Sequence, residues 1–316
     1  MQHGNFVISL DFELIWGLAG WQKEQIDTYI PNLQNATQAL KSIVDTLSKY
    51  NIKCTIGYVG FMIYHNAEEL SNHLPNHVPQ YYDMIFSSIH SLIPLIETVY
   101  PQELFFCPDI IEGLKGNQLI ELASHTLSHY YCLEEGQNIK AFEADIEKAQ
   151  EKGEGKLRSI IFPRNQVSEE HLIICRKYGF THYRGNINSY LYKARKTASR
   201  YTLAGALRLL DTYINISGHH CFKPTNKENG LKNIIGSCFL RPYSSKLKKL
   251  EKLKLARIKS SMLYAATHNQ TFHLWWHPHN FGLNLQENIQ ELEEICKYYK
   301  KLKETYNFTS KFISDF

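Results

Sequence analysis

The chain has 316 residues, of which 43% are hydrophobic and 21% charged, the balance of an ordinary globular protein. Its net charge of +4 is concentrated in residues 246–259, where seven Lys or Arg accompany one Glu, so the remainder offers no general nucleic-acid surface. Its seven cysteines are scattered and never spaced CxxC, which indicates neither a disulfide framework nor a zinc finger. There is no transmembrane segment and no leader-like start, so we expect a cytoplasmic protein.

The first predicted element is a buried parallel strand at residues 5–17, NFVISLDFELIWG, which is almost entirely apolar. A helix with apolar residues at helical spacing follows up to Tyr50, and a β-rich run at 51–60 completes a βαβ unit. Five prolines then interrupt the pattern. We interpret residues 61–116 as a helical insertion that covers one mouth of a barrel.

The alternation of strands and helices resumes after this insertion. Strands are predicted at 118–125, 159–162, 178–185, 239–243 and 271–277, with a closing strand at the C-terminus, and helices are predicted around 139–149, after Ser168, at 202–213, at 246–259 and around 289–302. Repeated βα units of this length favour one α/β barrel domain spanning residues 1–316 over a two-domain protein.

Two acids interrupt the first strand. Because strand side chains alternate, Asp11 and Glu13 point to the same face, together with Val7 and Ser9. Ionised carboxylates in a desolvated place need a cation or a hydrogen-bond network. A salt bridge to Arg or Lys would satisfy one of them, but a same-face pair at the end of a core strand favours a metal or catalytic site.

The segment SHTLSH follows the predicted third strand. If it is helical, the i, i+4 spacing places His125 and His129 on one face, able to hold one metal ion. An HxxxH pattern also arises by chance. This one lies at the carboxyl end of a strand, where α/β barrels carry their active sites, as does Glu13. One carboxylate and two imidazoles make the open three-ligand site of catalytic zinc.

Two more segments carry candidate residues. In FPRNQ, Arg164 either binds Asp11 through a bidentate fork or is a surface arginine. In HLWWHPHNFG, strand alternation places Trp275 and His277 on one face, which suits a general acid beside an apolar wall, although a core histidine is the alternative.

Together, DFE, HTLSH, FPRNQ and WWH resemble the motifs of the polysaccharide deacetylase family, the NodB-homology enzymes, from about residue 5 to 310. The resemblance implies a distorted (β/α) barrel of about seven parallel strands and a divalent metal, most commonly zinc. It implies that Glu13, His125 and His129 bind the metal, that Asp11 is the general base tethered by Arg164, and that His277 is the general acid, with Asn165 and Trp275 at the substrate.

The sequence departs from the family pattern at three points. The ligand acid is Glu13, one residue further from Asp11 than in the adjacent-acid form. A proline precedes Arg164 in the third motif, and Trp275 replaces a leucine that walls the acyl pocket.

The resemblance implies hydrolysis of an N-acetyl group on an amino sugar or glycan in surface-polysaccharide metabolism. The alternatives are a related amide hydrolase acting on a formyl group or small amide, and an inactive glycan-binding module. The basic segment 246–259 is either a solvated helix with its leucines packed inward or a peripheral contact with anionic lipid.

Overall fold

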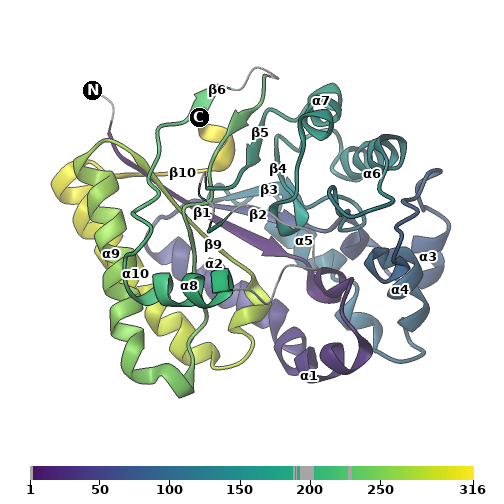
Figure 1. Cartoon of the computed structure of the whole chain (residues 1–316), viewed down its shortest axis with the longest axis horizontal. Helices are drawn as coiled ribbons and strands as arrows, with labels where there is room; N and C mark the ends of the chain where they lie inside the picture. The colour runs from purple at the N-terminus through teal and green to yellow at the C-terminus, as the bar shows by residue number, and fades with distance from the viewer. Residues whose placement is uncertain (1–2, 188, 190, 193–202, 227–229) are drawn as a thin grey trace.

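The computed structural model describes residues 3–187, 189, 191–192, 203–226 and 230–316 (Figure 1). Strand β1 (Asn5–Phe12) lies at the centre of the sheet and is buried along nearly its whole length. It pairs in parallel with β2 (Cys54–Tyr58), β9 (Thr271–Trp276) and β10 (Thr309–Lys311). A long apolar run is therefore needed here, because both faces of β1 are covered.

The first strand is shorter than predicted. The ladder stops at Phe12, Glu13 has φ −134° and ψ −8°, and a 3-10 helix, η1, occupies Leu14–Leu18. Leu14 itself has a left-handed φ of 45°. The chain thus turns sharply just after the two acids, which leaves Glu13 at the carboxyl end of the strand.

The described strands form one sheet in the order β6-β7-β5-β4-β3-β2-β1-β9-β8, with β10 beside β1, and all pairs except β6 with β7 are parallel. This confirms the predicted α/β class and its distorted barrel. The remaining strands are β3 (Ile120–Ser124), β4 (Ser159–Ile161), β5 (His182–Arg184), β6 (Thr225–Asn226), β7 (Lys232–Asn233) and β8 (Cys238–Phe239).

One short segment, residues 234–240, joins the two ends of this sheet. The amides of Ile234 and Gly236 donate to the carbonyls of Tyr183 in β5 and of Gly185 just after it, at 2.9 and 3.0 Å. The amides of Ser237 and Leu240 donate instead to carbonyls of His273 and Trp275 in β9, at 2.9 and 2.8 Å. We call this segment the seam, because it connects the β5 side of the barrel to the β9 side.

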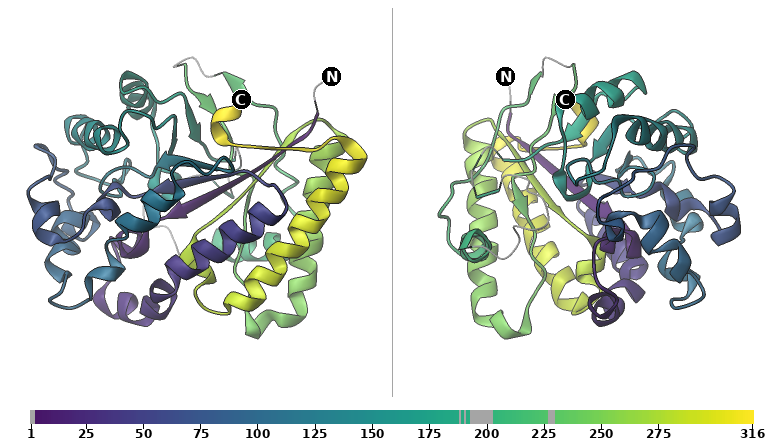
Figure 2. Two further views of the ribbon diagram at one scale, coloured as in Figure 1. Left: turned by 180° about the vertical axis from the view of Figure 1, so that it is seen from behind. Right: turned by 45° about the vertical axis from the view of Figure 1, so that its right-hand side comes forward.

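Helices cover the outside of the sheet (Figure 2). On one side α10 packs between α2 and α9, and on the other α6 packs against α7. The helices are α1 (Lys23–Gln34), α2 (Ala36–Lys49), α6 (Ile139–Lys152), α7 (Glu169–Lys177), α8 (Leu203–Tyr213), α9 (Glu251–Thr267) and α10 (Leu285–Tyr306). The helices expected in these places are confirmed, except that residues 246–250 of the helix expected at 246–259 belong to a 3-10 helix, η8 (Ser245–Leu250). Thr202, the first residue of another expected helix, lies outside the described residues.

Residues 61–116 form short helices, as predicted for the insertion. They are η2 (Gly60–Ile63), α3 (Ala67–Ser71), η3 (Met84–Phe86), α4 (Ser88–Ser91), η4 (Ile93–Leu95), η5 (Gln102–Leu104) and α5 (Pro108–Leu114). Indole Nε1 of Trp16 donates to the carbonyl of Phe105 at 2.8 Å, and Oγ of Ser88 donates to the carbonyl of Ser128 at 2.6 Å. The insertion therefore packs on the loops that follow β1 and β3. Within the described chain, none of the helices combines the length and apolar character needed to cross a bilayer.

Candidate active site

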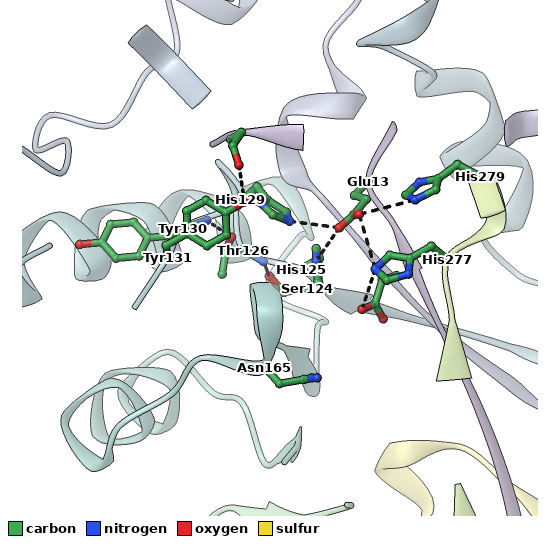
Figure 3. Close-up of polar contacts among 12 residues, drawn as sticks. Glu13, Ser124, His125, Thr126, His129, Tyr130, Tyr131, Asn165, His277 and His279 are labelled. Carbon is green, nitrogen blue, oxygen red and sulfur yellow. Dashed lines mark hydrogen bonds and ion pairs between the residues drawn. The ribbon is translucent and has the colours of Figure 1, made fainter. Parts of the chain in front are cut away.

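Glu13 lies at the centre of four imidazole rings (Figure 3). Its Oε2 is 3.1 Å from Nε2 of His125 and 3.0 Å from Nε2 of His129. Its Oε1 is 3.5 Å from Nε2 of His277 and 3.9 Å from Nε2 of His279. The carboxylate is buried, and each of its oxygens faces a pair of histidines.

The loop that carries His125 and His129 is not helical, although a helix was the condition under which the HxxxH spacing would place both imidazoles on one face. Thr126 and His129 have left-handed φ values of 63° and 58°, which turn the chain back on itself. Asp145 on α6 holds this turn: it accepts from the amides of Leu127 and Ser128 at 2.7 and 3.0 Å. Both imidazoles reach Glu13 through this compact loop.

Burial and neighbouring charges set the protonation states of Glu13 and His129. Burial alone would raise the pKa of Glu13, but His277 and the hydrogen bonds from His125 and His129 hold it well below its ordinary value. Burial lowers the pKa of His129 to about 4, against the opposing pull of Glu13. An ionised carboxylate and a neutral imidazole are the protonation states that metal binding requires.

These residues fit a divalent metal. One ligand atom each from Glu13, His125 and His129 lies within 4.8 Å of the other two, and all three side chains are buried. A carboxylate with two imidazoles is a donor set used by catalytic zinc, which keeps a further position open. The backbone of Gly17 also packs closely against the carboxylate of Glu13, because a Cβ on Gly17 would lie 2.1 Å from its Oε1.

Asp11, two residues earlier on the same face, forms a bidentate ion pair with Arg184 at the end of β5. The guanidinium nitrogens lie 2.5 Å from Oδ1 and 2.7 Å from Oδ2. Burial would raise the pKa of Asp11, but Arg184 outweighs it and lowers the pKa, with help from His277. Trp275 stacks on the guanidinium, with its ring centre 4.2 Å away.

This pairing corrects the prediction that Arg164 tethers Asp11. Arg164 adopts a left-handed φ of 52°, and its guanidinium stacks on Tyr131 at 4.2 Å and lies 3.6 Å from Glu134. Asn165 lines the pocket, but its Oδ1 accepts from Arg184 at 3.0 and 3.1 Å. Arg164 and Asn165 thus both line the edge of the pocket, and neither contacts Asp11.

A pocket of about 330 Å³ opens onto Asp11, Glu13 and His277. Nε2 of His277 is 3.6 Å from Oδ2 of Asp11 as well as close to Glu13, and its side chain is 22% exposed. It is therefore the member of the cluster that reaches the solvent side. Aromatic rings form much of the remaining wall, contributed by Trp21, Tyr29, Phe239 and Trp275.

The structure brings together five of the predicted residues, namely Asp11, Glu13, His125, His129 and His277. Sequence reasoning missed Arg184, His279 and Asp145. A signal existed for Arg184, because an arginine at the end of a predicted core strand needs a buried anion. None existed for Asp145, which lies on a helix and acts on a loop.

No protein-family model matches the sequence, and no curated protein matches it either. Among solved structures, a Mycobacterium smegmatis protein assigned as a polysaccharide deacetylase is similar over 96% of this chain and 91% of its own, with TM-score 0.54 and 11% identity. A Puue allantoinase (98% and 88%, TM-score 0.53, 10% identity) and a GH57-type branching enzyme from Pyrococcus horikoshii (100% and 70%, TM-score 0.53, 10% identity) are also similar. The chain therefore has the distorted (β/α) barrel fold that polysaccharide deacetylase structures share.

Proposed function

We propose that the protein is a metal-dependent hydrolase that removes an N-acetyl group from an amino sugar or glycan. The observation that carries this proposal is the shared face of β1. Glu13 contacts two imidazoles there, and Asp11, held separately by Arg184, lies beside the same pocket. A salt-bridge role would use both acids alike, whereas here each has a different set of partners.

Each residue has a chemical task in this proposal. A divalent metal, for which we propose zinc, would be held by Glu13, His125 and His129 and would supply Lewis-acid activation of water and of the acyl oxygen. Asp11 accepts the proton of the attacking water, and Arg184 keeps that carboxylate ionised and oriented. His277 donates a proton to the departing nitrogen, which is a poor leaving group as an anion.

The pocket supports a small substrate or the end of a chain. Its volume of about 330 Å³ lies at the lower end of small-molecule sites. Trp275 and Phe239 pack with ring centres 4.9 Å apart on one wall, and Trp21 and Tyr29 pack at 5.4 Å on another. Flat apolar walls of this kind suit the face of a sugar ring. We place the reaction in cytoplasmic surface-polysaccharide metabolism as part of the proposal.

A second candidate is a hydrolase of formyl or other small amides on the same site. The bulk of Trp275 beside Arg184 favours it, because the indole occupies space that a longer acyl group would need. The two candidates differ in the acid released. Enzymatic detection of acetate and of formate from matched N-acetyl and N-formyl amino sugars distinguishes them.

The test compares the two acids in purified protein stripped with chelator and reloaded with zinc, cobalt or nickel. Glu13→Gln should bind metal at least about 10-fold more weakly, and added metal should restore part of the activity. Asp11→Asn should retain its metal and lose roughly 10²–10⁴ in rate, with no rescue. If metal-loaded wild type releases neither acetate nor formate from the N-acetyl and N-formyl amino sugars, the protein is instead a binding module.

A further inference from the structure

Helix α8 exposes the side chains that a surface helix normally buries. Leu210 is 46% exposed and Ile214, just after the helix, is 55% exposed, whereas Asp211 and Tyr213 are buried. Leu207, Leu209 and Ile216 are exposed as well. A helix of a water-soluble domain has the opposite pattern, and contiguous exposed apolar side chains mark an interaction site.

A buried polar cluster fixes this orientation of α8. Oδ1 of Asp211 accepts from the amides of Ile216 and Ser217 at 2.9 and 2.8 Å. Its Oδ2 accepts from Oγ of Ser217 at 2.7 Å and lies 3.5 Å from Nη2 of Arg257 on α9. These contacts anchor Asp211 toward the interior of the molecule. In this orientation of α8, Leu210 and Ile214 are left exposed to solvent.

The start of α9 extends the apolar face. Leu253 precedes Arg257 by one helical turn, and Arg257 is the α9 residue that contacts Asp211 of α8. Leu250 lies just before the first residue of α9. Leu253 is 46% exposed and Leu250 is also exposed. Figure 1 shows α8 crossing beside α9 in the lower part of the molecule. We call these seven leucines and isoleucines the α8–α9 surface.

Basic side chains flank Leu250 and Leu253 of this surface along the chain. The exposed ones are Arg241, Lys246, Lys248, Lys249 and Lys252, and none of them forms an ion pair with another described residue. Of the nearby acids, Glu251 and Glu291 both lie against Nζ of the buried Lys254, at 2.5 and 2.7 Å. Lys254 balances only one of the two carboxylates, but the exposed cations outnumber the other, so the segment keeps a net positive charge.

We propose that the α8–α9 surface docks the protein on an anionic membrane. Exposed leucines and isoleucines insert at the boundary of headgroups and acyl chains, and lysines gain from the negative surface potential. A second copy of the chain fits less well, because a two-fold contact would place the positive segment against itself. A nucleic acid would match the lysines but not the leucines.

Docking would bring the catalytic pocket close to the membrane. Phe239 lines the pocket, and the chain runs from it through Arg241 directly to the lysine-rich turn Ser245–Leu250. The substrate would then be an amino sugar attached to a lipid. This last step rests on the proposed function, whereas membrane docking itself does not.

The experiment measures co-sedimentation of the full chain with vesicles of phosphatidylcholine alone or with 30% phosphatidylglycerol, at low and high salt. Two double variants test the surface, Leu210→Ser with Ile214→Ser and Lys248→Gln with Lys249→Gln. Matched controls are Ile173→Ser, an equally exposed isoleucine on α7, and Lys300→Gln with Lys301→Gln near the far end of α10.

Wild type should bind the anionic vesicles, bind neutral ones far less, and lose binding as salt increases. Each test variant should weaken binding by about tenfold or more, since each lysine near an anionic surface contributes roughly fivefold. The controls should bind like wild type, and circular dichroism should show all variants folded. Because no activity is measured, failure here leaves the proposed hydrolase untouched.

Two outcomes would overturn the docking proposal. In the first, test variants and controls lose binding equally, so general positive charge accounts for the association. In the second, sedimentation equilibrium shows that wild type is a dimer that the Leu210/Ile214 variant converts to a monomer, without vesicle binding. The α8–α9 surface would then be an interface between two copies.

Discussion

The ion pair between Asp11 and Arg184 can be tested by removing the cation and leaving the anion. In Arg184→Met, the carboxylate of Asp11 stays buried but loses both hydrogen bonds to the guanidinium. Arg184 is only 1% exposed, so water cannot easily replace it. Removing one partner of such a buried pair costs about 3–5 kcal/mol of unfolding free energy at neutral pH.

The pH dependence of this loss has a definite sign. In wild type the pKa of Asp11 is lowered, so its contribution to stability is present above the unfolded value and is lost as pH falls through the folded value. Desolvation by burial is the largest influence on the pKa of Asp11. In Arg184→Met the guanidinium no longer opposes it, so the pKa of Asp11 is raised. The variant therefore loses stability as pH rises, and the difference from wild type grows from acid to neutral pH.

The assay is urea unfolding of wild type, Arg184→Met, Asp11→Asn and the double variant between pH 4 and 8. The double variant should recover much of the loss at neutral pH, because it no longer buries an unpaired charge. Arg164→Met is the matched control. Its guanidinium stacks on Tyr131 and lies 3.6 Å from Glu134, so its loss should cost about 1–2 kcal/mol with no rescue by Asp11→Asn.

The kinetic counterpart is the acid limb of kcat/KM. It should move to higher pH in Arg184→Met, because a base with a raised pKa is protonated over a wider range. Equal costs for Arg184→Met and Arg164→Met, together with an unmoved acid limb, would refute the assignment of Arg184 as the residue that orients Asp11.

Three further predictions concern the rest of the site. Gly17→Ala should weaken zinc affinity by about 10-fold or more in a competition titration, since its Cβ would displace Glu13, whereas Gly113→Ala, with nothing within 4 Å, should not. Asp145→Asn should weaken zinc affinity about 10–100-fold. Burial raises the pKa of Asp145 to about 6. Urea unfolding should therefore show that wild type loses unfolding free energy relative to this variant as pH rises from 4 through 6. His277→Gln should slow amides far more than activated esters of the same sugar, and equal losses on both would contradict a proton-donating role.

The order of strands and helices was predictable because buried parallel strands are long apolar runs and the helices between them carry apolar stripes. The end of the first strand was not. Leu14 adopts a left-handed φ, and nothing in the residue type signals that conformation. The same limit applies to His129, where the expected helix is replaced by a turn that Asp145 holds across 17 residues of sequence.

The metal-binding candidates were predictable because carboxylates and imidazoles at strand ends have few other uses. Choosing between the two arginines was not, because Arg164 comes just after one predicted strand and Arg184 lies near the end of another. The decision depends on register: Ile161 in β4 lies opposite Arg184 in β5, which brings that guanidinium to the level of Asp11. Arg164 lies three residues after the end of β4, where a left-handed turn directs it toward Tyr131. Register between neighbouring strands is a property of the assembled sheet.

The seam also has a consequence for motion. Residues 234–240 connect the two sides of the barrel through a single chain, whereas β1 and β9 share a ladder from Asn5 to Leu10. Amide hydrogens of the seam should therefore exchange through local opening at a lower free energy than those of β1, which should require global unfolding. Phe239 belongs to the seam and lines the pocket. Each opening would widen the pocket while β1 keeps Asp11 and Glu13 in place, so substrate entry and catalytic geometry depend on different parts of the sheet.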